Sequence, residues 1–150
     1  MDRSYIGWKI LLWFIAGYHA SLGLLMMFSG ELTIQTIKAV AGVTVTGSPL
    51  LGVVGEILAC YLLAFALIMG VAAWNPVKNR AAISVGLVLF ALRLFQRIFF
   101  AEKTMQIMQI PPIKYWSAAA LVAILAGLMG IFRWQLYRDM HDPATSSDSA

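Results

Sequence analysis

The sequence predicts an all-α, four-helix transmembrane bundle with both termini in the cytoplasm. Of its 150 residues, 61% are hydrophobic and only 12% are charged, and the mean hydropathy is +0.80. Soluble domains carry roughly 45–50% apolar and about 25% charged residues. Four apolar stretches reach the roughly 20 residues that a helix needs to cross a bilayer. None of them alternates strictly between apolar and polar residues, as a membrane β-strand would.

The spans are expected at about residues 6–28, 50–74, 81–100 and 115–134. Trp74-Asn75-Pro76 should end the second span, because proline lacks an N–H and disfavours helix in the residue before it. Pro111-Pro112 should break the chain before the fourth span. The first span is expected to be retained, since its apolar run exceeds the roughly 7–15 residues typical of a signal peptide.

The segments outside the spans also carry predictions. In the long loop at 29–49, Leu32, Ile37 and Val40 recur near helical spacing, which predicts a short helix at the membrane interface. Residues 43–46 look extended, and a turn should follow them before the second span. Residues 139–150 are expected to form a disordered tail, which leaves 1–138 as one transmembrane domain.

Orientation follows from the Lys and Arg residues outside the membrane, which favour the cytoplasmic side. The side that holds the termini carries Arg3, Lys9, Lys78, Arg80, Arg133 and Arg138. The opposite side carries Lys38, Lys103 and Lys114. The bias predicts a multi-pass protein of the bacterial inner membrane with cytoplasmic termini.

Several classes of function are excluded by what the sequence lacks. A single cysteine, Cys60, excludes an intrachain disulfide and a Cys-rich metal centre. The chain has no Lys/Arg run of the kind that marks a nucleic-acid surface. It also lacks the G-x-S-x-G, P-loop and H-E-x-x-H motifs. We therefore assign no catalytic residue, no metal site and no nucleic-acid partner, and expect no catalytic activity from the chain alone.

Polar side chains inside the spans are the most informative feature, because they are costly in lipid and usually face a bundle interior or a cavity. At a rise of about 1.5 Å per residue, Glu56 lies about 9 Å, Arg93 about 11 Å and His19 about 14 Å below the outer ends of their spans. Gln96 and Arg97 share a helix face with Arg93 through i, i+3 and i+4 spacing. Three helices should therefore bring polar groups to the same outer half of the membrane.

Two interpretations of this cluster remain open. Glu56 is the carboxylate at matching depth, so we predict a Glu56–Arg93 ion pair that could serve only to fix the helix register. Arg97 should then reach toward Glu102 or bind an anion. In the functional interpretation, His19, Glu56, Arg93, Gln96 and Arg97 line a small polar pocket. It would hold a quinone head group, a lipid phosphate or another anion.

His19 has its own alternatives, either a packing histidine with a satisfied ring or the ligand of a haem or pigment. The other histidine, His141, lies outside the spans, so a bis-histidine haem within this chain is excluded. Small residues spaced four apart, Ala119-Ala123-Gly127 above all, mark faces where helices can approach closely. Packing within the bundle is the favoured explanation of that face, and docking of another subunit is the alternative.

The order of features resembles the DoxX-like superfamily of small four-helix bacterial membrane proteins. The resemblance rests on a positive start, a long first loop, the opening Gly52-Val53-Val54-Gly55-Glu56 of the second span and the basic turn at residues 75–80. It implies a four-helix fold for most of the chain, to about Tyr137. Some members are membrane subunits of oxidoreductases that deliver electrons to quinone. Only Glu56 matches a family position.

We therefore expect a small accessory or structural subunit of a larger respiratory or photosynthetic membrane complex. Its partners would be the lipid bilayer and other membrane subunits or further copies of the chain. The alternative is a quinone- or lipid-binding component of a membrane oxidoreductase that uses the polar pocket. Quinone or bound lipid is the expected cofactor, with a pigment or haem on His19 as a further option.

Overall fold

The computed structural model describes residues 5–41 and 49–141, which form helices and no strand. The helices are α1 (Ile6–Phe28), α2 (Gly30–Ala41), α3 (Pro49–Trp74), α4 (Arg80–Phe99), α5 (Ala101–Met108) and α6 (Pro112–His141). Four of them, α1, α3, α4 and α6, are long and apolar enough to cross a membrane. The all-helical prediction is confirmed, and the architecture is that of a multi-pass membrane protein.

Local sequence explains where the long helices end. α3 stops at Trp74, as predicted from Pro76, and the following turn is closed by side-chain amides. The backbone N–H of Lys78 donates to Oδ1 of Asn75 at 3.1 Å, and Nδ2 of Asn79 donates to the carbonyl of Val71 at 2.9 Å. These bonds satisfy backbone groups that the end of a helix leaves open.

The break before α6 also has a backbone cause. Gln109 adopts a left-handed conformation with φ of 50°, and Pro112 is the first residue of α6. Proline suits a first helical position, because its missing N–H would have had no partner within the helix.

One unpredicted helix and the length of α6 differ from the prediction. α5 was not predicted, because its eight residues are too few and on average too polar to be a membrane span. α6 begins at Pro112 and ends at His141, so residues 139–141 belong to a helix and not to the tail. The short helix expected in the first loop is present as α2. The expected extended segment at 43–46, the turn after it and the tail at 142–150 lie outside the described residues.

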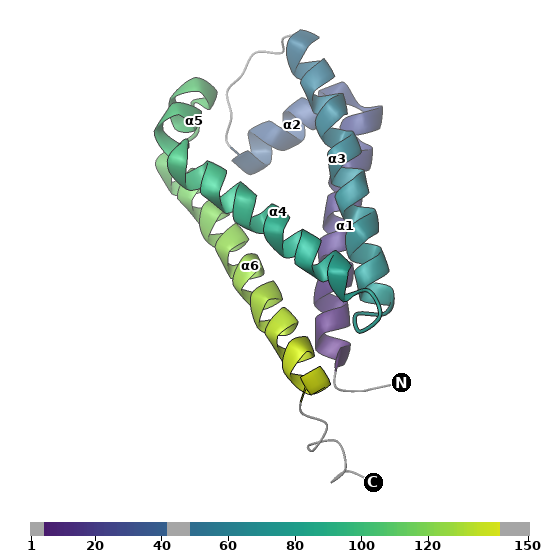
Figure 1. The fold of residues 1–150 in the computed structure, drawn as a ribbon. Coiled ribbons are helices and arrows are strands. Elements are labelled where there is room, and N and C mark those ends of the chain that lie inside the picture. Colours follow the sequence, from purple (N-terminus) through teal and green to yellow (C-terminus); the bar gives the residue numbers. More distant parts are fainter. Residues whose placement is uncertain (1–4, 42–48, 142–150) are drawn as a thin grey trace.

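The long helices associate as two pairs, α1 with α3 and α4 with α6 (Figure 1). The pairs approach each other at the end where α1 begins and α6 ends, and they diverge toward the opposite end, where α2 and α5 lie. We call these the terminal end and the distal end. Most of the contact between the pairs runs through α3 and α4.

The main core fills the region where the pairs converge. Trp8 of α1 stacks on Phe132 of α6 with ring centroids 4.9 Å apart. All four long helices contribute buried apolar side chains to this core, among them Leu12, Ile15, Met69, Ala73, Ile83, Phe90, Met129, Phe132 and Leu136. A second, smaller cluster of Met26, Ala59 and Leu62 joins only α1 and α3. Toward the distal end the core is therefore confined within a pair.

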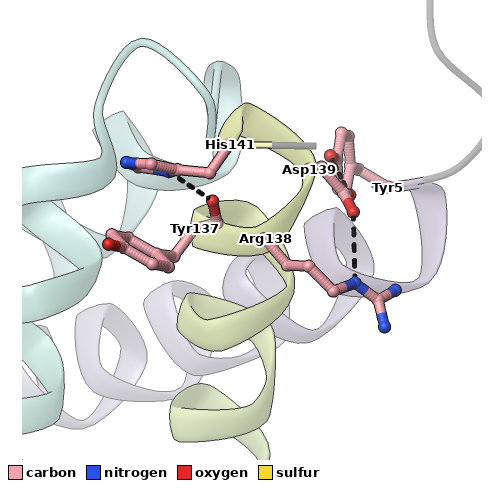
Figure 2. Close-up of polar contacts among 5 residues, drawn as sticks. All are labelled: Tyr5, Tyr137, Arg138, Asp139 and His141. Atoms are coloured by element: carbon pink, nitrogen blue, oxygen red, sulfur yellow. Dashed lines mark hydrogen bonds and ion pairs between the residues drawn. The ribbon is translucent and has the colours of Figure 1, made fainter. Parts of the chain in front are cut away.

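Polar contacts close the terminal end (Figure 2). The hydroxyl of Tyr5 donates to Oδ2 of Asp139 at 2.7 Å, which ties the start of α1 to the end of α6. The other carboxylate oxygen lies 3.9 Å from Nε of Arg138. Tyr137 and His141 stack one helical turn apart, with ring centroids separated by 4.1 Å. The structure thus places the two ends of the helical domain on the same side.

Candidate functional site

A ring cluster forms where α1, α3 and α4 meet. His19 of α1 is only 5% exposed, and its ring meets Phe65 of α3 and Phe90 of α4 edge to face, at centroid distances of 4.7 and 6.3 Å. The two phenylalanines contact each other at 5.5 Å in the same geometry. Edge-to-face packing directs the positive ring edge at a negative ring face. Three helices thus hold the His19 ring in place.

Two arginines lie on the same side of α4 as Phe90, closer to the distal end. Arg93 and Arg97 follow Phe90 by three and seven positions, so all three lie on one side of the helix. Arg93 is close enough to Tyr18, His19 and Arg97 to interact with each of them electrostatically. We call Tyr18, His19, Arg93 and Arg97 the cationic site. Because the His19 ring contacts Phe90, one turn before Arg93, the structure brings His19 to the side of α4 that carries the arginines.

Arg97 is positioned by α6. Its guanidinium carbon lies 5.3 Å from the centre of the Tyr115 ring, a distance typical of a cation–π contact. The Tyr115 hydroxyl donates to the carbonyl oxygen of Arg97 at 2.7 Å, and Tyr115 is only 3% exposed. The expected reach of Arg97 to Glu102 is not observed, because Glu102 lies on α5 and accepts a hydrogen bond from Gln106 at 3.3 Å.

The predicted Glu56–Arg93 ion pair is not formed. Among the side chains that the structure describes, the one ion pair joins Arg138 and Asp139. The reason is the rotation of α3. Phe65 contacts α4, and it follows Glu56 by nine positions, which is about two and a half turns. Glu56 therefore lies on the side of α3 opposite α4, where it is exposed. Similar depth in the membrane did not place the two charges on facing sides.

The remaining predicted member, Gln96, is exposed on α4 and has no side-chain hydrogen bond in the described part of the chain. Tyr115 was not predicted to belong to the site. It lies 18 positions from Arg97, and only the pairing of α4 with α6 brings the two together. The site also includes Tyr18. The sequence alone does not show which side of α1 faces α4, so the place of Tyr18 follows only from the contacts of its neighbour His19.

The chemistry of the cationic site differs from that of an ion-paired cluster. Two guanidinium groups share one helix side, and in the part of the chain that the structure describes no carboxylate pairs with either of them. Guanidinium groups offer only hydrogen-bond donors, in a fork that matches the oxygens of phosphate or carboxylate. The site can therefore bind oxygen-rich anions. No group of three or more His, Cys, Asp or Glu side chains gathers in the described residues as a candidate metal site.

The small-residue face of α6 packs within the bundle over only part of its length. Ala119 is buried, but a side-chain carbon added at Gly127 or Gly130 would meet no atom within 4 Å. Gly17 of α1 is equally open. The half of this face nearer the terminal end is thus open at Gly127 and Gly130.

Comparisons with known proteins do not add a relative. No family model, no curated protein and no solved structure matches the chain.

Proposed function

We propose that this protein is a multi-pass membrane component that binds an anionic, oxygen-rich head group between its two helix pairs. The observation that carries the proposal is the pair of arginines, Arg93 and Arg97, on one side of α4 without a paired carboxylate in the described chain. A charge inside a membrane span costs several kcal/mol unless it is paired or solvated. An anionic ligand would reduce that cost, and the placement of Arg97 by Tyr115 supports a preorganised donor.

Native mass spectrometry on protein extracted in mild detergent tests the proposal. The wild-type chain should retain an anionic phospholipid at a stoichiometric ratio. Lipid extraction with absorption spectroscopy distinguishes it from a quinone, whose uncharged head group would contradict the proposal. Because a charge-assisted hydrogen bond contributes about 1.5–3 kcal/mol, Arg93→Gln or Arg97→Gln should weaken retention by about tenfold or more.

Arg133→Gln provides the matched control. Arg133 lies on α6, and its Nε donates to the Ser84 hydroxyl at 2.9 Å, away from the cationic site. This variant should retain the ligand as the wild type does. Equal retention by all three variants would refute binding at Arg93 and Arg97.

A second candidate is the role of an accessory subunit in a larger membrane complex. Glu56 favours it, because this carboxylate is exposed within the α3 span and has no partner among the described residues. The open glycines of α6 offer a further surface for close helix contact. In this role the partner would bring a polar or basic side chain to Glu56.

Cys60 provides a test of that second role, since it is exposed and lies one turn after Glu56 on the same side of α3. A thiol-linked photo-crosslinker on Cys60 should capture one defined partner in native membranes. Glu56→Gln should reduce this yield severalfold. An unchanged yield would exclude Glu56 from the contact.

The membrane and the orientation belong to the same proposal. We place the chain in the bacterial inner membrane with the terminal end in the cytoplasm, as the basic residues and the DoxX-like resemblance predict. With Cys60→Ser as background, a cysteine introduced at Lys78 should react with an impermeant thiol reagent only after lysis. Labelling of intact cells would reverse the orientation.

A further inference from the structure

The ring of His19 has a defined hydrogen-bonding state. Its Nδ1 lies 2.8 Å from the carbonyl oxygen of Ile15, one turn earlier in α1. A carbonyl oxygen only accepts hydrogen bonds, so Nδ1 must carry a hydrogen and donate it. In the neutral ring the other nitrogen, Nε2, is then an acceptor with a free lone pair. The neutral ring adds no third positive charge to a site that already holds two.

Nε2 has no partner in the part of the chain that the structure describes, although the residue is 95% covered by its neighbours. Tyr18, Phe65 and Phe90 surround the ring with their own rings, and their contacts are not hydrogen bonds to Nε2. Yet no fully buried side-chain nitrogen or oxygen lacks a partner among the described residues. Nε2 is therefore not fully buried, although most of the residue is.

Nε2 of His19 can only accept a hydrogen bond, whereas the Arg93 guanidinium can only donate. A ligand that binds both groups must therefore carry a donor as well as acceptors. Arg93 lies close enough to His19 to interact with it electrostatically, but the two side chains share no hydrogen bond. An isolated phosphate ester or carboxylate presents only acceptors, which satisfy Arg93 and leave Nε2 unmatched. A head group with a hydroxyl beside its anionic oxygens would satisfy both residues.

We propose that the cationic site binds an anionic membrane lipid whose head group also carries a hydroxyl. The anionic oxygens would accept hydrogen bonds from Arg93 and Arg97, and the hydroxyl would donate to Nε2 of His19. This inference rests on the proposed function and specifies its ligand. It makes His19 a specificity determinant, with neither a metal-ligating nor a purely packing role.

The state of the ring can be measured without any ligand. His141→Gln leaves His19 as the single histidine, so its two ring nitrogens can be assigned by ¹⁵N NMR of histidine-labelled protein in phosphatidylcholine nanodiscs. We expect a protonated Nδ1 and an unprotonated Nε2. Adding phosphatidylglycerol should shift the Nε2 resonance in the direction of a hydrogen-bonded acceptor. A protonated Nε2, or no shift, would overturn the inference.

Binding measurements then separate the two lipid features. Phosphatidylglycerol and phosphatidylmethanol have the same charge, but only the first has free hydroxyls. Because one neutral hydrogen bond contributes about fivefold in affinity, native mass spectrometry should show about fivefold preference for phosphatidylglycerol. His19→Phe should abolish that preference while both lipids still bind, and His19→Gln, which keeps an acceptor oxygen, should retain part of it. Arg93→Gln should weaken both lipids.

The failures of the two proposals are distinguishable. Equal binding of both lipids by the wild type would overturn the role of His19 and leave anion binding intact. If neither lipid bound more tightly than phosphatidylcholine, both proposals would fail. Displacement of phosphatidylglycerol by millimolar glycerol phosphate would show that the head group comes from a soluble phosphate ester, which would overturn the lipid assignment.

Discussion

At the scale of single residues, Tyr115 links the cationic site to the fold. Its buried hydroxyl donates to the backbone of Arg97, and its ring lies under the guanidinium group. The hydroxyl binds the backbone of α4 and so connects this helix to α6, whereas the ring contacts only the Arg97 side chain. Removing only the hydroxyl should therefore loosen the contact between α4 and α6 and leave the cation–π contact in place.

Tyr115→Phe should lower the free energy of unfolding by about 1 kcal/mol, the usual net contribution of one hydrogen bond. Tyr137→Phe is the matched control, because the Tyr137 ring is about half exposed and its contact with His141 is made by the ring face. That control should change stability by less than about 0.5 kcal/mol. Reversible unfolding in mixed detergent micelles measures both values. Equal effects of the two variants would refute the contribution of the Tyr115 hydroxyl.

At the scale of elements, the pairing of α1 with α3 depends on close approach at Gly23. A side-chain carbon at this position would lie 2.9 Å from Cγ of Leu63 and 3.2 Å from the carbonyl oxygen of Ala59. The leucine can rotate, but the backbone oxygen can move only with α3. Gly86 lies where α3, α4 and α6 meet. The space beside it is occupied by the flexible ends of the Met69 and Met129 side chains. Gly23 is thus the less tolerant of the two positions.

Gly23→Ala should cost about 1–3 kcal/mol of stability, which is typical of overpacking in a dense core. Gly17→Ala on the same helix is the control, because no atom lies within 4 Å of the carbon it would add. The control should be neutral or slightly stabilising, since alanine favours helix over glycine by roughly 1 kcal/mol. Thermal denaturation in detergent compares the two. If Gly23→Ala were as stable as the control, α1 and α3 could move apart without cost, and close approach at Gly23 would not be required.

The sequence predicted the helices better than their rotations. Apolar length and proline positions define spans independently of the partners, so four helices and the end of α3 at Trp74 were predictable. The direction in which a helix turns its polar side chains depends on its neighbours. Glu56 matched Arg93 in depth, but the contact of Phe65 with α4 turns Glu56 away. A depth estimate measures distance along a helix and contains no information about that rotation.

At the scale of the whole molecule, the two helix pairs converge at the terminal end and diverge toward the distal end. Charges that lie in the divergent half are therefore not neutralised by the bundle itself. Glu56 lies on an outer side of one pair, and Arg93 belongs to the cationic site of α1 and α4. This separation leaves both groups available to other molecules.

A double-mutant cycle on Glu56 and Arg93 tests this separation most directly. The free energies of unfolding of the wild type, Glu56→Gln, Arg93→Gln and the double variant give the coupling between the two side chains. Because the structure places them on non-facing sides, we predict a coupling within about 0.5 kcal/mol of zero. A coupling above roughly 1 kcal/mol, with stability recovered in the double variant, would show that the two charges neutralise each other and would contradict the proposed anion site.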